Sequence, residues 1–312
     1  MATVSKYSVT PLKFIFDDKT IAELVKDYLP KLPRYHVSLR IESDISIING
    51  IRRVIIEEIP TWIMTCQMTT IMTNSVYTSD FILDRLHMTP INYVNGLEGS
   101  IDILNTSTET ITVYTTDIEM HAKEKKIDPR DVCDKIRLCK LDPGEYINIP
   151  EIICERVVGT HGGESTLATN IEYNIVDEKE GMYVVDFAFD TVGNSDGVSI
   201  IPTACDVLIN RLINVKDFLD SGETVSDKYK LTLSELYNEL IIDDEDHTLG
   251  NIIAKSIYLT DPKIDIVNYL KIHPTEQRIS IKWIHESGID IVMESIVAVV
   301  KKLEKIKAAT LK

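Results

Sequence analysis

The chain has 312 residues, of which 44% are hydrophobic, so it is long enough for one large domain or two to three small ones around a real core. It has 33 Lys and Arg residues against 49 Asp and Glu residues, and the resulting net charge of −16 argues against nucleic-acid binding without a local basic patch.

Five cysteines without a Cys-x-x-Cys pair argue against a disulfide framework and a four-cysteine zinc site, and favour reduced thiols in the cytosol or nucleus. The first ten residues, MATVSKYSVT, lack the apolar core of an export signal. No apolar stretch reaches the roughly 18 residues that a membrane-spanning helix needs, so no membrane span is expected.

The first part of the chain alternates predicted strands and helices. Their order is a strand at 8–16, a helix at 19–29, strands at 35–41 and 61–72 around a helix at 45–59, and a short helix at 78–91. From about 94 to 160, turn residues separate short apolar runs, which predicts a β-rich region.

The second part of the chain begins with a strand at 182–193 and a helix at 201–219. The polar stretch at 220–230 is interpreted as a linker or domain boundary. A strand at 231–242, a helix at 248–259, further strands and a long helix at 289–308 follow. Lysines near the end of that last helix complement the helix dipole.

These elements form a weak internal repeat: each half has a strand, an early helix with an Asn-Gly or Gly-Asn pair, a sheet and a late amphipathic helix. Apolar residues at steps of three and four give each helix a stripe that can pack against another helix. The residues expected at the contact between the halves are Ile48, Ile51, Ile55, Leu208, Leu212, Leu249, Ile252, Ile253, Val292, Ile296, Val299 and Leu303.

Arg52 and Arg53 follow each other on the helix at 45–59, so they point about 100° apart and at least one lies near the edge of the apolar stripe. A solvated edge is one interpretation. The other is a protein interface, because arginine forms forked hydrogen bonds to carboxylates or carbonyls.

The sequence Asp243-Asp244-Glu245-Asp246-His247 carries the chemistry of a metal site, and a metal-dependent hydrolase is the alternative function. Adjacent carboxylates in an extended segment point in alternate directions and do not converge. The structural interpretation is a helix start, with Thr248 as the N-cap and the acidic residues near the positive end of the helix.

The other candidate sites favour structural roles. The sequence GTHGGES at 159–165 lacks the lysine and following helix of a phosphate-binding loop, and Cys133 and Cys139 lack zinc-ligand spacing. Asp186 and Asp190 are expected on a solvated sheet face, too far apart to share one ion. We therefore expect no metal and no cofactor.

Several of these stretches resemble the α-like assembly subunits of cellular RNA polymerases. Residues 48–54, INGIRRV, with Glu58-Ile59-Pro60-Thr61 behind them, are similar to the early helix of the larger subunit. Residues 81–86 followed by Pro90-Ile91, and 187–208, also resemble that subunit. Residues 245–251, EDHTLGN, with the later Asp261-Pro262 and His273-Pro274, resemble the smaller subunit.

The resemblance implies an α+β fold of two dimerisation modules, which are separate chains in cells and lie here in one chain, as in large cytoplasmic DNA viruses. The first module would comprise residues 1–93 and 161–219, interrupted by a β-rich domain at 94–160; residues 220–230 would be the linker and 231–312 the second module. Cellular relatives often carry a cysteine cluster in the inserted domain, which this chain lacks, and the helix at 19–29 has no counterpart.

By the same resemblance, the function is that of a subunit without a catalytic site, on which the largest and second-largest polymerase subunits assemble. Arg52 and Arg53 would contact the second-largest subunit, and small zinc-binding subunits are further expected partners. Nucleic acid would be reached only through the complex. The expected location is the viral factory in the host cytoplasm, with the virion as an additional location and the nucleus as the alternative.

Overall fold

The structure is a computed structural model that describes residues 2–13, 19–26, 29, 32–123, 125–158, 166–179, 181–193, 195–234, 236–264 and 266–311. It mixes helices with several antiparallel sheets, which confirms the predicted α+β class. No helix formed by these residues is both long and apolar enough to cross a membrane. The predicted glycine-rich loop at 159–165 lies outside the described residues, as does part of the helix expected at 19–29, whose described portion is α1 (Lys19–Val25).

The first sheet joins the N-terminal strands to strands from the middle of the chain. Its order is β1 (Thr3–Pro11), β2 (Tyr35–Ser43), β12 (Met182–Thr191) and β11 (Ala168–Lys179). The alternating apolar side chains of β12 point into the core, where Val185, Phe187 and Phe189 are buried. The polar face is paired across strands rather than simply solvated: Asp186 contacts Arg40, and Asp190 contacts His36, both at 2.7 Å.

The second sheet is built from the C-terminal part of the chain. Its order is β13 (Tyr229–Leu233), β14 (Asn238–Asp243), β16 (Arg278–Ile284) and β15 (Ile266–Lys271). The prediction of a single strand at 231–242 is therefore wrong, because the chain reverses after Leu233 and β13 pairs with β14 as a hairpin. Ser234 stabilises the reversal, as its hydroxyl donates to the Tyr237 carbonyl at 2.5 Å.

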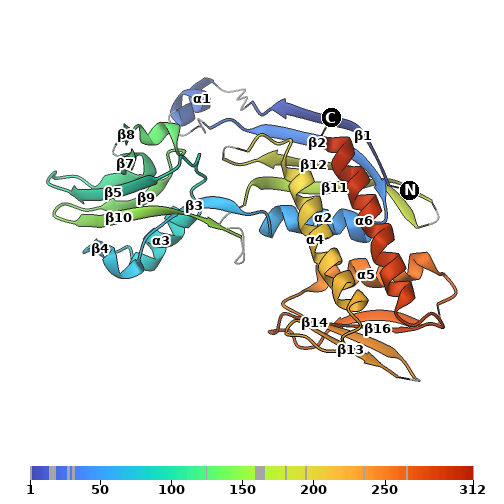
Figure 1. The fold of residues 1–312 in the computed structure, drawn as a ribbon. Coiled ribbons are helices and arrows are strands. Elements are labelled where there is room, and N and C mark those ends of the chain that lie inside the picture. The colour runs from blue at the N-terminus through green and yellow to red at the C-terminus, as the bar shows by residue number, and fades with distance from the viewer. Residues whose placement is uncertain are drawn as a thin grey trace.

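Four helices lie between these two sheets (Figure 1). They are α2 (Ile45–Glu57), α4 (Ile200–Asp220), α5 (His247–Thr260) and α6 (Asp290–Thr310), close to the predicted ranges. Asp44 starts α2 by accepting a hydrogen bond from the Ile47 amide at 3.2 Å, and Pro60 follows its end. The long helices α4 and α6 pack along each other, while α2 and α5 contact each other and α4.

A third region, between α2 and β11 in sequence, has a core of its own. Its larger sheet has the order β3 (Thr61–Thr65), β10 (Tyr146–Val157), β5 (Leu97–Leu104), β7 (Glu119–Ala122) and β8 (Lys125–Ile127), with β4 (Met72–Thr73) beside β10. A smaller sheet pairs β6 (Ile111–Tyr114) with β9 (Arg137–Leu141), and α3 (Ser79–His87) packs against β3 and β9. Short 3-10 turns occupy 68–70, 115–117 and 129–131.

Two separate hydrophobic clusters fill the molecule. The first combines both ends of the chain, from Ala2 to Ile59 and from Ala168 to Ile306. The second runs only from Met64 to Ile152 and already includes Ile82 and Leu86 of α3. The boundary between the two cores thus falls near residue 60, earlier in the chain than the β-rich pattern at 94–160 indicates.

Candidate functional site

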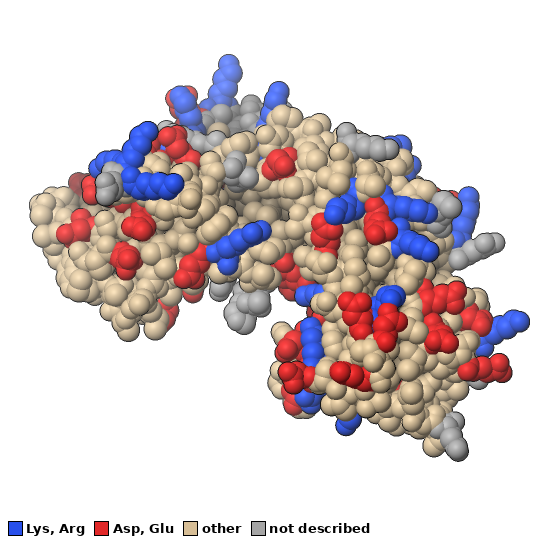
Figure 2. All heavy atoms as spheres, viewed as in Figure 1, with Lys and Arg blue, Asp and Glu red and all other residues tan. Residues whose placement is uncertain are grey.

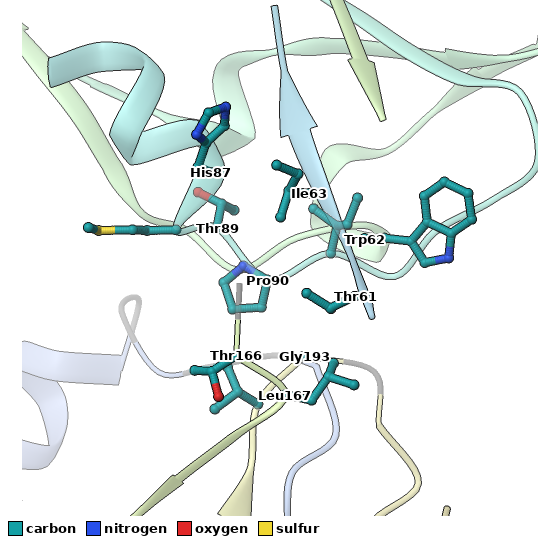
Figure 3. Close-up of a pocket in the computed structure, with 12 residues that line it drawn as sticks. Thr61, Trp62, Ile63, His87, Thr89, Pro90, Thr166, Leu167 and Gly193 are labelled. Atoms are coloured by element: carbon teal, nitrogen blue, oxygen red, sulfur yellow. The ribbon is translucent and has the colours of Figure 1, made fainter. Parts of the chain in front are cut away.

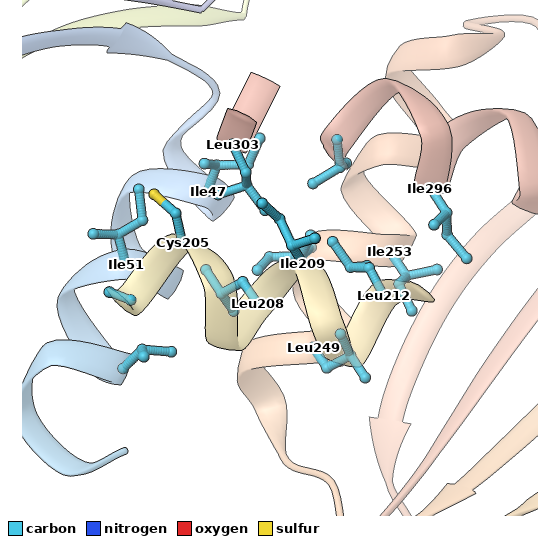
Figure 4. Packing of buried hydrophobic residues seen from close by; sticks show 14 of the residues in the cluster. Ile47, Ile51, Cys205, Leu208, Ile209, Leu212, Leu249, Ile253, Ile296 and Leu303 are labelled. Carbon is cyan, nitrogen blue, oxygen red and sulfur yellow. The ribbon is translucent and has the colours of Figure 1, made fainter. Parts of the chain in front are cut away.

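The junction of α2, α4, α5 and α6 is the candidate functional site, because it joins segments from both ends of the chain. All twelve residues predicted for this contact are at most 1% exposed and belong to the same core cluster. Figure 4 shows Leu208, Ile209 and Leu212 of α4 between side chains of the other three helices. The 3-and-4 spacing places each of these residues on the inward stripe of its helix.

The two early helices approach each other closely at Gly50. A Cβ atom added to Gly50 of α2 would lie 2.7 Å from the Cδ1 atom of Ile252 on α5. The corresponding Gly250 of α5 faces a neighbour in the same way, with its added Cβ 2.7 Å from the Tyr269 ring. The Asn-Gly and Gly-Asn pairs of the two early helices therefore mark close packing.

Two ion pairs connect α6 to α2 and α4. The Lys302 ammonium lies 3.0 Å from Asp44, the buried N-cap residue of α2. The Lys307 ammonium lies 2.6 Å from Asp206 of α4. These lysines, expected to complement the helix dipole, also hold the long C-terminal helix in register with α2 and α4.

A cluster of charged side chains closes the other end of the junction. Arg53 of α2 contacts Asp246 at 2.6 Å, and Arg211 of α4 contacts Glu58 at 2.6 Å and Glu245 at 3.6 Å. Lys228 also pairs with Glu245, at 3.2 Å. The acidic stretch before α5 is thus tied to three different segments. A shallow pocket lies over this cluster.

Burial raises the pKa of the two glutamates in this cluster. The Glu245 residue is only 4% exposed, and desolvation raises the pKa of its carboxyl above the ordinary value, against the opposing charges of Arg211 and Lys228. Desolvation likewise raises the pKa of Glu58, again opposed by Arg211. The cluster therefore fixes the positions of α2, α4 and the start of α5 relative to one another, at a cost in the desolvation of the two carboxylates.

The two predicted contact arginines differ in their surroundings. Arg53 is engaged with Asp246 inside the chain, whereas the Arg52 Nε atom donates to the Asn49 side chain of its own helix at 3.0 Å. Both side chains are partly exposed. Asn49 therefore orients Arg52. Among the described residues, no other side chain pairs with Arg52, so the ends of its guanidinium fork are available for a contact with another protein.

The residues Asp243 to His247 do not converge on a common point. Asp243 pairs with Arg278, Glu245 and Asp246 pair with the cluster described above, and His247 packs edge-to-face on Tyr269 at 5.9 Å. Across the described ranges, no group of three or more His, Cys, Asp or Glu side chains is arranged to hold a metal ion. The structure gives the metal-dependent hydrolase no support.

The cap of α5 is Asp246, so the prediction of Thr248 as N-cap was wrong. The Asp246 carboxylate accepts a hydrogen bond from the Thr248 amide at 2.8 Å, which satisfies one of the free amides at the helix start. Thr248 is already inside the helix and its hydroxyl is buried without a hydrogen bond.

The five cysteines are free and show no reactive environment. Burial raises the pKa of Cys133 and Cys139 to about 11, and that of Cys154 and Cys205 to about 12. These thiols stay protonated at neutral pH and are poor nucleophiles and metal ligands.

A small pocket lies where the β-rich region meets the first sheet (Figure 3). It measures about 50 Å³ and is bordered by Thr61, Pro90 and Gly193. The one histidine at its edge, His87, hydrogen-bonds to Thr65 at 3.0 Å. The pocket has neither the volume nor the paired acid and base of a catalytic site.

The most informative charges at the junction were not found from the sequence. Arg211 and Lys228 had no motif to mark them, and Glu58 was noted only within the stretch that resembles the larger polymerase subunit. Asp44 and Asp206 gave no sign of their lysine partners. The only available signal was a charged residue at the edge of an otherwise apolar helix stripe, as at Arg211.

Comparison with known proteins gives two kinds of match. The sequence profile of the RNA polymerase Rpb3/Rpb11 dimerisation domain matches residues 237–309, which include α5 and α6. The chain is also similar to proteins named DNA-directed RNA polymerase RPB3-11 homolog from African swine fever virus. It is 24% identical to that of the isolate Pig/Kenya/KEN-50/1950 over 300 residues, covering 83% of each chain.

A second viral relative gives the same result. The homolog of the isolate Tick/Malawi/Lil 20-1/1983 is 25% identical over 276 residues, which cover 77% of this chain and 76% of the relative. Both alignments extend well beyond the dimerisation domain. The chain is therefore similar over most of its length to viral Rpb3/Rpb11-like RNA polymerase subunits, and residues 237–309 match the dimerisation domain of that family.

Proposed function

We propose that the chain is a non-catalytic assembly platform of a multisubunit DNA-directed RNA polymerase, and that its two halves form an intramolecular pseudo-heterodimer. One observation carries this proposal. The helices of the dimerisation domain, α5 and α6, bury their apolar stripes against α2 and α4 of the same chain. The surface that a separate partner would cover is thus occupied by the first half of the polypeptide.

The energy of this contact supports a permanent association. Full burial of a Leu, Ile or Val side chain contributes about 1.5–3 kcal/mol, and twelve such residues lie at the junction. Covalent connection raises the effective concentration of the halves and fixes their ratio at one to one. The connection itself is short and exposed, from Ser221 to Asp227.

The domain organisation that we propose follows the predicted one with a single change. Residues 1–93 and 161–219 were assigned to the first module, 94–160 to the insertion, 220–230 to the linker and 231–312 to the second module. Because the second core starts at Met64 and ends at Ile152, we infer that the inserted unit extends from about Thr61 to Val157.

Arg52 is the residue that we infer to contact a large polymerase subunit. It lies at the rim of the junction, is oriented by Asn49, and has donors left for carboxylates or carbonyls of a partner. Arg53 would assist, although its bond to Asp246 already serves the internal junction. The inferred partners are the largest and second-largest subunits and small zinc-binding subunits, and the inferred location is a cytoplasmic viral factory.

The test is co-purification of the chain with the second-largest subunit after co-expression. We expect Arg52→Ala to reduce recovery of that subunit while the chain stays folded, and Arg52→Ala with Arg53→Ala to reduce it further. Arg130→Ala removes an exposed arginine from the β-rich region and serves as the control. Undiminished recovery with the double variant would remove both arginines from the proposed contact.

A further inference from the structure

A basic hollow lies on the β-rich region, well apart in sequence from Arg52 and Arg53. It measures about 410 Å³ and is lined by Arg85, Thr112, Tyr114, Lys135, Arg137 and Lys140. No acidic side chain lines it, although the chain as a whole has a net charge of −16. On the face shown in Figure 2, Asp and Glu side chains are frequent, especially over the C-terminal sheet and its helices.

The strand pair β6–β9 builds this surface. Thr112 lies opposite Lys140, and Tyr114 lies opposite Arg137, on neighbouring antiparallel strands. Val113, Leu138 and Cys139 between them are buried in the second core. The irregularity in the pairing between Val113 and Tyr114 brings Arg137 and Lys140, three positions apart, to the same outer face. The fold thus places these charges side by side on a rigid sheet.

The remaining basic residues are held beside aromatic rings. The Lys135 ammonium lies 4.4 Å from the centroid of the Tyr114 ring, and the Arg85 guanidinium lies 5.2 Å from that of Phe81 on α3. Both distances are within the range of cation–π attraction. These contacts help to fix the positions of the charged groups.

The acids near the hollow make their own contacts with other groups. Asp134 pairs with Arg34 at 3.1 Å, Asp117 accepts from the Tyr114 amide, and Asp142 accepts from the Thr110 hydroxyl. Among the described residues, no carboxylate lies in ion-pair contact with Arg85, Arg137 or Lys140. Three cations therefore face solvent together.

We propose that the basic hollow docks an acidic segment, rich in Asp and Glu, of a partner protein. The guanidinium forks of Arg85 and Arg137 match carboxylates, and Lys140 adds a point charge. A nucleic-acid strand fits less well. Lys135 covers the Tyr114 ring on which a base would stack, and the negative chain repels a polymer with one charge per about 1.7 Å.

This inference does not depend on the contact assigned to Arg52, since the two surfaces belong to different core clusters. The test uses the full chain and a short fluorescein-labelled polyglutamate peptide, with binding followed by fluorescence anisotropy at low salt. We expect saturable binding that weakens as salt is added, because exposed charges are screened. Failure of the peptide to bind would overturn the proposal.

Arg137→Ala with Lys140→Ala should weaken peptide binding by roughly two- to thirty-fold, the combined effect of losing two exposed ion pairs. Both side chains are exposed, so the thermal midpoint should stay that of the parent chain. Lys301→Ala with Lys305→Ala removes the same charge from exposed positions on α6 and should leave binding unchanged. Equal losses from the two double variants would overturn the proposal.

A labelled single-stranded oligothymidine distinguishes the two classes of polyanion. We expect it to bind more weakly than the peptide and without dependence on Arg137 and Lys140. Tighter binding of the oligonucleotide that is lost in the Arg137→Ala and Lys140→Ala chain would contradict the proposal and identify the hollow as a nucleic-acid surface.

Discussion

The two cores of this molecule are assembled in different ways. The β-rich core draws all its members from one continuous part of the chain, Met64 to Ile152, whereas the core at the helix junction needs residues from Ala2 to Ile59 and from Ala168 to Ile306. The first is therefore local and the second depends on distant segments meeting. From this difference we expect that changes within residues 61–157 leave the helix junction intact.

The strongest test of this difference places a charge in the junction. Leu208→Asp puts a carboxylate at a fully buried position of α4 and should cost more than about 4 kcal/mol of the free energy of unfolding. Hydrogen exchange followed by mass spectrometry should show lost protection in α2, α4, α5 and α6, with protection of β5 and β10 retained.

Ile213→Asp is the matched control, because this residue of the same helix is 38% exposed. It should leave both regions protected. Loss of protection in β5 and β10 together with the helices in the Leu208→Asp chain would show that the two cores are one cooperative unit.

A smaller effect is expected from adding a side chain at the close contact between α2 and α5. Gly50→Leu forces a side chain against Ile252 and Leu208 and should cost about 1–3 kcal/mol, as overpacking does in other cores. Denaturant unfolding would measure it. Glu57→Leu introduces a leucine at an exposed position of α2 and should change the free energy of unfolding little. Equal losses of stability in the two variants would argue against a close approach at Gly50.

Loss of a cross-junction ion pair should have a smaller effect still. Lys302→Met leaves the buried Asp44 carboxylate without its cation and should cost about 1–2 kcal/mol, visible as a lower denaturant midpoint. Lys301→Met changes the preceding, exposed lysine and should be neutral. An unchanged midpoint for Lys302→Met would mean that the pair does not hold α6 in register.

The smallest expected effect is a pH dependence. The folded-state pKa of Glu245 is raised above its ordinary value of 4.5, so its contribution to stability is fully present below that pH and is lost as pH rises through the folded pKa. Glu245→Gln cannot titrate. Its thermal midpoint relative to the parent chain should therefore rise between about pH 4.5 and neutrality, and a falling difference would show that Arg211 and Lys228 outweigh desolvation.

The helices of the junction could be predicted from the sequence because their signal is local. Apolar residues at steps of three and four placed α2, α4, α5 and α6 within a few residues of their observed ends. The hairpin of β13 and β14 was missed, because its reversal at Ser234 and Tyr237 lacks the glycine or proline that marks most turns. Local sequence patterns therefore predicted the helices more reliably than the turn between β13 and β14.

The ionic cluster could not be predicted because its partners are distant in sequence. Arg53 and Asp246 are 193 residues apart, and no local pattern connects them. The cap of α5 was misassigned for a related reason: Asp246 and Thr248 are both good capping residues, and only the backbone geometry decides which one caps the helix.

The most direct test of the pseudo-heterodimer is cleavage of its connection. A specific protease site inserted between Gly222 and Glu223, in an exposed turn where no side chain packs on Gly222, would divide the chain without touching either core. After cleavage, the account predicts that the two fragments elute together on gel filtration with the parent chain's apparent mass. Their separation into two folded monomers would contradict it.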